Sequence, residues 1–470
     1  LDAGDIIHGT AVEKTFEGEP VIAAMSAMGY DAAAAGNHEF DMGQRVTRKA
    51  WERATFPFLS ANVLDTKTGK PWASLRPYII REIDGVRVAI FGLTTPSTVQ
   101  IEWPRTIEGI TFADFLPIAA ELVPRLRAQE RADVVIALTH LGVKDEKRLA
   151  AAVPGIDIIV GGHSHTRLNE QVWENGTLIV QTGAHAVTLG RIDLLIGAPA
   201  SDGGKRPITV NGRDGRWWGH GDVPAPPVLP ATSATPATSA TPATSATSAT
   251  SQQANHPFPA GPLIPLTEAI ADDPAVVAAY RPFAERVQPV LDEVLTEALE
   301  PLPALHATRR EVAVGQLLAD AIRAHAKSDV ALAASSQIAP RGLIAGPVRV
   351  ADLYDLLIAY TRQHIVVLRA PGVRLREMVA SVAADAEKFP VHISGFTVAG
   401  DRISVGDQPL DDSRGYTIAG PAHVIQDYFL GRPGVEILKD DAASPHVRDA
   451  AIEFLRKHPP LRNTVEKRIR

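Results

Sequence analysis

The chain has 470 residues, of which 45% are hydrophobic and 21% are charged, a balance typical of globular proteins that are too long for one hydrophobic core. Its 47 basic and 54 acidic residues give a net charge of −7, which argues against a scaffold that binds nucleic acid polymers. Cysteine is absent, so disulfides, thiolate metal sites and cysteine nucleophiles are excluded. No apolar run reaches the roughly 18–20 residues that a membrane-spanning helix needs.

The first half of the chain has the pattern of an α/β domain, which we place at residues 1–221. Short runs rich in β-branched residues predict buried strands, and amphipathic stretches between them predict helices. The predicted strands are Val86–Gly92, Val134–Leu138, Ile156–Val160 and Leu178–Gln181, and the predicted helices are Phe112–Gln129 and Glu146–Ala152. We expect residues 222–262 to be a disordered loop, because their Ala-Thr-Ser-Pro repeats contain no large apolar side chain to bury.

The second half begins with a predicted connecting helix within residues 263–299. Asp273 followed by Pro274 is a favourable helix start, and apolar residues then recur at helical spacing. Pro282 and Pro289 are expected to kink or interrupt this helix. Residues 300–470 are predicted to form a second α/β domain. Its predicted elements are the helix Glu311–Ala326 and the strands Val330–Ala333, Ile365–Leu368 and Tyr416–Ala419.

Four polar segments of the first domain point to metal chemistry. They are residues 4–5 (GD), 36–41 (GNHEFD), 139–142 (THLG) and 161–166 (GGHSHT). The last three follow strand-like runs, and the carboxyl ends of parallel strands meet at one edge of a sheet. Each segment alone is compatible with an ordinary turn or a surface histidine. Four of them in order, with glycines beside the polar residues, favour a site whose nitrogen and oxygen ligands suit Mn²⁺, Zn²⁺, Fe²⁺ or Mg²⁺.

This series of segments resembles the calcineurin-like metallophosphoesterases. Together with residues 58–62 (FLSAN) and 86–95 (VRVAIFGLTT), it resembles the branch of 5′-nucleotidases, UDP-sugar hydrolases and 2′,3′-cyclic nucleotide phosphodiesterases. The resemblance implies a four-layer αββα metallophosphoesterase domain followed by a C-terminal α/β substrate domain. It also implies a hydrolase with two divalent metal ions (Mn, Zn, Fe, Mg or Ca), a small phosphate ester as substrate, and a periplasmic or extracellular location.

The resemblance also assigns roles to individual residues. Asp5 matches the carboxylate that bridges two metals. Four other residues match ligands, namely Asn37, His140 and His163 for one metal and His165 for the other. His38 and Asp41 match a catalytic pair that assists the leaving group while a hydroxide bridging the metals attacks phosphorus. His8 and His185 are interpreted as loop residues outside the ligand set.

Relatives carry an Asp-x-His motif on their first strand that supplies two further ligands. This chain begins at Leu1 with no match to it, and Asp2 has no histidine two residues later. No targeting segment is visible either. We therefore expect that the first strand is missing and that the first metal keeps only Asp5 and His165. A site with two ligands should bind its metal weakly, so the prediction of an enzyme stands beside the alternative that this polypeptide is inactive.

The second domain diverges from the family in its substrate loops. Residues 311–321 (EVAVGQLLADA) resemble a family segment, but residues 335–341 and 359–362 retain only parts of the loops that bind the nucleotide. Arg309, Arg341 and Tyr360 are the best substrate-binding candidates, with surface residues as the alternative. A basic stretch forms either an anion-binding face or an exposed surface, and consists of Arg362, Arg369, Arg374 and Arg376.

Three functions follow from this reading. The leading hypothesis is hydrolysis of 5′-nucleotides or related nucleotide and sugar phosphates. The second keeps the metal core but acts on a carrier-bound thiosulfonate, as thiosulfohydrolases of the same superfamily do. The third is a binding protein without catalytic activity. The sequence leaves the oligomeric state open.

Overall fold

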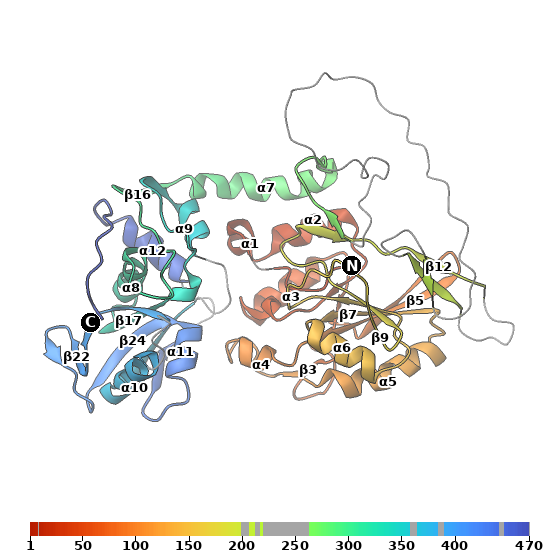
Figure 1. The fold of residues 1–470 in the computed structure, drawn as a ribbon, viewed down its shortest axis with the longest axis horizontal. Coiled ribbons are helices and arrows are strands. Elements are labelled where there is room, and N and C mark those ends of the chain that lie inside the picture. The colour runs from red at the N-terminus through yellow and green to blue at the C-terminus, as the bar shows by residue number, and fades with distance from the viewer. Residues whose placement is uncertain are drawn as a thin grey trace, which may run out of the picture.

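The computed structural model describes residues 1–7, 9–198, 206–211, 217–219, 263–357, 364–383, 390–440 and 446–469. The tract at 222–262 lies outside these ranges, as do His8, Tyr360 and Arg362. Figure 1 shows two lobes side by side, with the helix α7 (Pro274–Leu291) running along the edge between them. In the part of the chain that is described, no helix has the length and apolar character needed to cross a membrane.

The N-terminal lobe is built on a six-stranded sheet with the strand order β4-β5-β7-β8-β10-β9. The four central strands are parallel and the two edge strands are antiparallel to their neighbours. The parallel strands are β5 (Val86–Thr94), β7 (Val134–His140), β8 (Ile158–Gly161) and β10 (Thr177–Val180), and the edge strands are β4 (Tyr78–Ile83) and β9 (Val172–Glu174). Strand β7 has the near-continuous apolar sequence of a strand that is covered on both faces.

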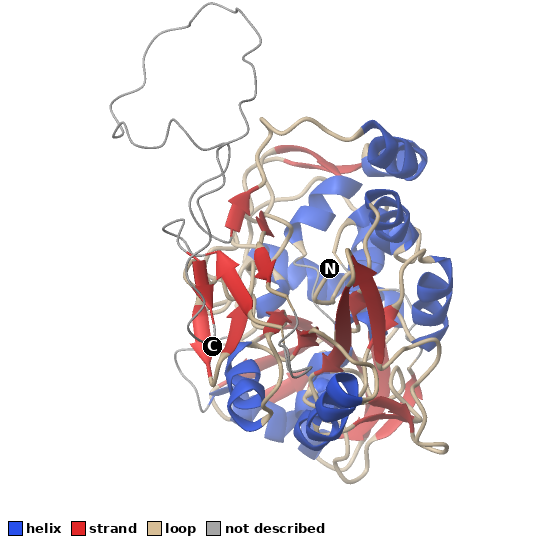
Figure 2. Cartoon of the chain, turned by 90° about the vertical axis from the view of Figure 1, so that its right-hand side faces the viewer, coloured by secondary structure: helices blue, strands red, loops and turns tan. Residues whose placement is uncertain are grey.

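Four layers make up this lobe, as the family resemblance predicts. One face of the six-stranded sheet buries apolar side chains against α5 (Phe115–Ala128) and α6 (Val143–Ala152). Its other face meets two short parallel strands, β1 (Ala33–Ala34) and β2 (Phe58–Leu59). An aromatic core then separates β1 and β2 from the helices α2 (Glu19–Met28) and α3 (Gln44–Arg53). Figure 2 shows the lobe from its outer side, with helices on either side of the strands.

Short elements complete the N-terminal lobe. Strand β11 pairs with β15, so the segments before and after the undescribed tract lie side by side. The remaining elements are α1 (Ala11–Thr15), η1 (His38–Phe40), β3 (Val63–Asp65), α4 (Thr98–Ile101), β6 (Ile110–Phe112), β11 (Thr188–Gly190), β12 (Leu194–Ile196), β13 (Ile208–Asn211), β14 (Trp217–Gly219) and β15 (Leu263–Pro265).

Helix α7 begins where the sequence predicts. The Asp273 carboxylate accepts hydrogen bonds from the backbone N–H groups of residues 275 and 276, at 2.7 and 3.3 Å, and Pro274 occupies the first helical position. The helix ends at neither Pro282 nor Pro289, so the expected interruption does not occur. Phe283 packs edge-on against Phe16 of the N-terminal lobe, with 5.2 Å between ring centroids. This contact fixes α7 on that lobe.

The C-terminal lobe contains a five-stranded sheet with the order β20-β17-β24-β19-β25. Side chains alternate along β17: positions 330, 332 and 334 belong to one apolar cluster, and positions 331 and 333 to another. The strands are β17 (Val330–Ala334), β19 (Ile365–Pro371), β20 (Val391–Ser394), β24 (Gly415–Pro421) and β25 (Glu436–Lys439). On one face lie α8 (Ala313–Ala326), α9 (Val350–Leu356) and α12 (Val447–Leu455), and on the other α10 (Gly372–Ala383) and α11 (Ala422–Tyr428).

Smaller elements surround this sheet, namely β16 (Val294–Ala298), η2 (Ser335–Gln337), β18 (Gly346–Arg349), β21 (Phe396–Ala399), β22 (Arg402–Val405) and β23 (Gln408–Pro409). Trp103 follows α4 of the N-terminal lobe, yet it belongs to the apolar cluster of the C-terminal lobe. Its indole N–H donates to the Asp440 carboxylate at 2.6 Å, and Arg105 forms an ion pair with the same carboxylate at 2.9 Å. The lobes are therefore joined by a buried side chain as well as by α7.

Candidate metal centre

Chain topology brings three of the four polar segments to one edge of the lobe. Residue 37 follows β1, His140 is the last residue of β7, and residue 163 follows β8. Because these strands end on the same side, their loops converge. The fourth segment joins them because Asp2 pairs in parallel with Ala33, which carries Asp5 to the same place.

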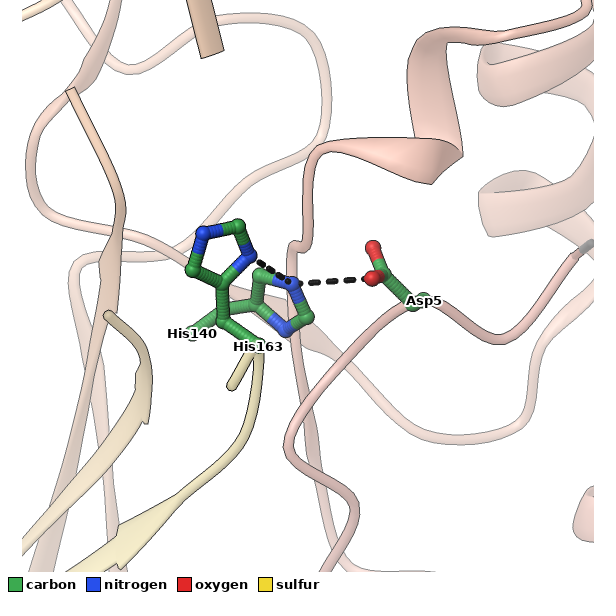
Figure 3. Close-up of side chains that lie close together, drawn as sticks. All are labelled: Asp5, His140 and His163. Carbon is green, nitrogen blue, oxygen red and sulfur yellow. Dashed lines mark hydrogen bonds and ion pairs between the residues drawn. The ribbon is translucent and has the colours of Figure 1, made fainter. Parts of the chain in front are cut away.

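The four predicted ligands of one metal meet at a single atom, His140 Nε2. The Asp5 carboxylate lies 2.9 Å from it, the Asn37 side-chain oxygen 3.2 Å, and His163 Nδ1 3.3 Å. Figure 3 shows the Asp5, His140 and His163 side chains pointing toward one another. Each of these three residues offers a ligand atom within 4.8 Å of the others. One carboxylate oxygen, one amide oxygen and two imidazole nitrogens are a donor set that fits a divalent transition metal.

Hydrogen bonding prepares His140 for this role. Its Nδ1 lies 2.7 Å from the Ala3 carbonyl oxygen, an acceptor, so Nδ1 carries the proton and Nε2 faces the ligand cluster. Burial opposes the charged form of Asp5, but the positive charge that His140 carries while no cation is bound to its Nε2 lowers the pKa of that carboxyl. Burial together with the charge of His140 lowers the pKa of His163 to about 4. Asp5 is thus held as a carboxylate and His163 as a neutral imidazole, the forms in which these groups bind metals.

The glycines of the motifs provide room for the convergence. A Cβ at residue 36 would overlap the Asp5 carboxylate, and a Cβ at residue 162 would lie 2.9 Å from the Ala3 carbonyl oxygen. Asp5 and His163 themselves have positive φ angles of 64° and 72°, which residues other than glycine rarely adopt. Such backbone strain is concentrated at functional sites, where the surrounding structure enforces it.

Glu39 was given no role from the sequence, but it holds the first two segments together. Its carboxylate is fully buried and accepts hydrogen bonds from three backbone N–H groups, those of Asp5 (3.0 Å), Ile6 (2.5 Å) and Gly36 (2.5 Å). These bonds fix the loop that carries Asp5 against the loop that carries Asn37. Its position as an acidic residue inside the GNHEFD motif was the sequence feature that could have predicted this role.

The predicted catalytic pair lies beside the ligands. His38 Nδ1 is 3.1 Å from the Asp41 carboxylate, and His38 Nε2 is 3.9 Å from the Asp5 carboxylate. Burial disfavours a charged His38, but Asp41 and Asp5 outweigh it and raise the pKa of His38 to about 9. A further carboxylate, that of the fully buried Glu102, lies within 4.8 Å of both members of the pair. Sequence patterns missed Glu102 because it lies in a loop far along the chain.

His165 lies apart from the four converging ligands. It is exposed, has a positive φ of 53°, and packs edge-on against His185, with 5.7 Å between ring centroids. Among the described residues, it is absent from the groups whose ligand atoms lie within 4.8 Å of one another. His185, which we interpreted as a loop residue, is therefore a direct neighbour of the ligand predicted for the other metal.

The structure brings none of the predicted substrate-binding residues that it describes to the candidate metal ligands. Arg309 and Arg341 are exposed on the C-terminal lobe, and Tyr360 lies outside the described residues. Within the predicted basic stretch, Arg374 pairs with Glu377 at 2.6 Å and Arg376 with Asp412 at 2.9 Å. These carboxylates neutralise the two arginines, which favours an exposed surface over an anion-binding face.

Comparisons with known proteins match both lobes of the chain. Residues 1–167 match the family model of the calcineurin-like phosphoesterases, and residues 294–430 match the model of the 5′-nucleotidase C-terminal domain. The trifunctional nucleotide phosphoesterase protein YfkN of Bacillus subtilis is 34% identical over 228 residues, 41% of this chain and 16% of that protein. A 5′-nucleotidase of Vibrio cholerae is 39% identical over 176 residues, 35% of this chain and 32% of that protein.

The chain thus spans less than a third of the length of either relative. Among solved structures, a 5′-nucleotidase precursor of Thermus thermophilus matches over the whole chain and 89% of its own, with a TM-score of 0.64 and 22% identity. At that identity the likeness shows the fold alone. Family models therefore match the N-terminal lobe to the calcineurin-like phosphoesterases and the C-terminal lobe to the 5′-nucleotidase C-terminal domain. The fold agrees with both matches.

Proposed function

We propose that this protein hydrolyses phosphate esters, foremost 5′-nucleotides or related nucleotide and sugar phosphates, with the help of divalent metal ions. The observation that carries the proposal is the convergence of Asp5, Asn37 and His163 on His140 Nε2, within 3.3 Å. Four ligands of the type that binds Mn²⁺, Zn²⁺ or Fe²⁺, drawn from four separate segments, point to a metal centre rather than to ordinary turns.

One cation is assigned to these four residues, and the family resemblance assigns a second to Asp5 and His165. When bound, two such cations supply an activated water and positive charge for the phosphoryl oxygens. The protein's own contribution is to hold the ligands in place. Glu39 fixes the loops of Asp5 and Asn37, and the Ala3 carbonyl orients His140.

His38 is assigned the protonation of the leaving group. Asp41 binds Nδ1 of the ring at 3.1 Å, so the proton available for transfer is the one on Nε2, which faces the metal ligands. Because the pKa of His38 is raised to about 9, the ring is charged at neutral pH. It can therefore donate a proton from Nε2 to the departing alkoxide as the bond between phosphorus and oxygen breaks.

The nucleotide preference rests on the C-terminal domain. Its match to the 5′-nucleotidase model covers residues 294–430, and the relatives from Bacillus and Vibrio are named for nucleotides. The thiosulfonate hypothesis and the binding-protein hypothesis share the same N-terminal lobe, so a substrate panel must separate them. From the family resemblance we also propose export from the cytoplasm, which fractionation of the cells that naturally produce the protein tests.

The decisive experiment measures metal content and hydrolysis in the same samples. Mn²⁺-loaded protein is assayed on 5′-nucleotides, UDP-sugars, bis-(p-nitrophenyl) phosphate and a thiosulfonate. Asn37→Ala should lose metal and activity together. His38→Ala should retain its metal while turnover falls by about 10²–10⁴-fold, the usual contribution of a general acid. His306→Ala, which removes an exposed imidazole of the other lobe, is the matched control.

Two outcomes would contradict the proposal. Loss of metal in His38→Ala equal to that in Asn37→Ala would make His38 a ligand instead of an acid. Tight Mn²⁺ binding by the unaltered protein without turnover of any substrate in the panel would favour a binding protein.

A further inference from the structure

A buried carboxylate with no role in the proposed chemistry lies behind the metal ligands. Glu146 is in the first turn of α6, and its side chain is fully buried. Its two oxygens lie 2.9 and 2.8 Å from the amide nitrogen of Gln181, and the Thr139 hydroxyl donates to one of them at 3.1 Å. All these donors are neutral. Burial therefore raises the pKa of Glu146 to about 7. The hydrogen bonds from these neutral donors do not offset the free energy of removing the carboxylate from water.

Gln181 extends this contact to the loop of His163. Its amide nitrogen also donates to the Gly162 carbonyl oxygen at 2.9 Å, and its side-chain oxygen accepts a hydrogen bond from the Ser164 hydroxyl at 3.0 Å. The nitrogen faces acceptors and the oxygen faces a donor, so the orientation of the amide is determined. Gln181 therefore holds the residues on both sides of His163.

Glu146 thus connects the two histidine loops. Thr139 immediately precedes His140, and Gln181 donates a hydrogen bond to the carbonyl oxygen of the residue before His163. The loop is pressed directly against the carboxylate, since a Cβ at residue 161 would overlap the Glu146 side chain. This close approach accounts for the first glycine of the GGHSHT segment.

We propose that Glu146 is a positioning residue of the metal centre, which acts through Gln181 and Thr139 to hold His140 and His163 at the spacing that a cation requires. This inference rests on the proposed metal centre. A neutral side chain of similar size would fill the same space without a buried charge. The carboxylate becomes advantageous when a cation sits at the two histidines, because its negative charge then favours the bound state.

The test compares Mn²⁺ affinity, measured by titration calorimetry, with the melting temperature in EDTA. In Glu146→Gln, an amide group replaces one acceptor oxygen and faces the amide of Gln181, so two donors oppose each other. We expect Mn²⁺ affinity to fall by about 10–100-fold, as is common when a residue supporting metal ligands is changed. Asp145→Asn is the matched control, since Asp145 lies in the same turn and pairs at the surface with Arg148 at 2.7 Å.

Rescue separates positioning from a general loss of stability. The exchanged pair Glu146→Gln with Gln181→Glu restores one carboxylate and one amide, and should recover part of the lost affinity. Thr139→Val keeps the shape but removes one donor, and should weaken Mn²⁺ binding by a few-fold even if Glu146→Gln fails to fold. Unchanged affinity in Glu146→Gln and Thr139→Val, or an equal loss in Asp145→Asn, would overturn the inference alone. Absence of Mn²⁺ binding by the unaltered protein would overturn the metal centre itself.

Discussion

Replacing Trp103 should loosen the docking of the two lobes while leaving the metal ligands in place. Trp103 is 2% exposed, is carried by the N-terminal lobe, and lies in the apolar cluster of the C-terminal lobe. Truncating a buried aromatic side chain to alanine costs about 3–5 kcal/mol. Trp103→Phe isolates the indole bond to the Asp440 carboxylate, a bond to a charged group worth about 1.5–3 kcal/mol. Both changes destabilise the docked arrangement alone, because separated lobes would expose the side chains of Trp103 and Asp440 to water.

The absence of cysteine makes the arrangement of the lobes directly measurable. Spin labels are attached at Glu121→Cys on α5 and Ser381→Cys on α10, both exposed, and the distance distribution is recorded by pulsed electron resonance. We expect one narrow distribution in the parent, a broad one in Trp103→Ala and an intermediate one in Trp103→Phe. Trp173→Ala, on β9 and 37% exposed, is the control and should match the parent.

A Trp103→Ala distribution as narrow as that of the parent, in protein that retains its helical content, would refute this reasoning. The docking would then depend on α7 and its contact between Phe16 and Phe283. Asp440→Asn provides a second check, since it keeps an acceptor for the indole but removes the charge that pairs with Arg105. We expect the distance distribution of Asp440→Asn to broaden less than that of Trp103→Ala.

Three further changes test other parts of the structure. Gly36→Ala should abolish metal binding, measured by metal analysis, because its Cβ would overlap the Asp5 carboxylate; retained metal would show that the loop adapts. Asp273→Ala should lower the free energy of unfolding by about 1 kcal/mol through loss of the helix cap, as followed by urea denaturation. Asp157→Ala should cost about 1.5–3 kcal/mol in the same assay, because Arg127 and a buried backbone N–H lose their acceptor; a change below about 0.5 kcal/mol, the usual range for surface sites, would contradict this.

Local sequence patterns were sufficient for the central strands and the capped helices. The apolar runs that form β5, β7, β8 and β10 are buried on both faces, so hydrophobicity alone marks them. The start of α7 was equally clear, because the carboxylate and the proline act within three residues of the helix end. The two prolines inside α7 do not end the helix, which packs on the N-terminal lobe across them, so a local rule against proline was insufficient to set its length.

For the metal site, the sequence by itself determined which residue types are present and that three of the four segments follow a strand. The resemblance of its motifs to a known family then marked Asp5, Asn37, His140 and His163 as candidate ligands. Only the tertiary structure decided that the four meet within 3.3 Å of one nitrogen and that His165 lies beside His185 instead.

Supporting contacts between distant segments were decided by the fold alone. Gln181 reaches Glu146 across 35 residues, and Trp103 reaches Asp440 across 337. Neither pair has a motif, because each side chain is ordinary in its own segment and gains its role only from the partner that folding brings to it. The sequence therefore determines the candidate ligands and the strands that precede most of them, whereas the tertiary structure decides what holds these residues in place and what holds the two lobes together.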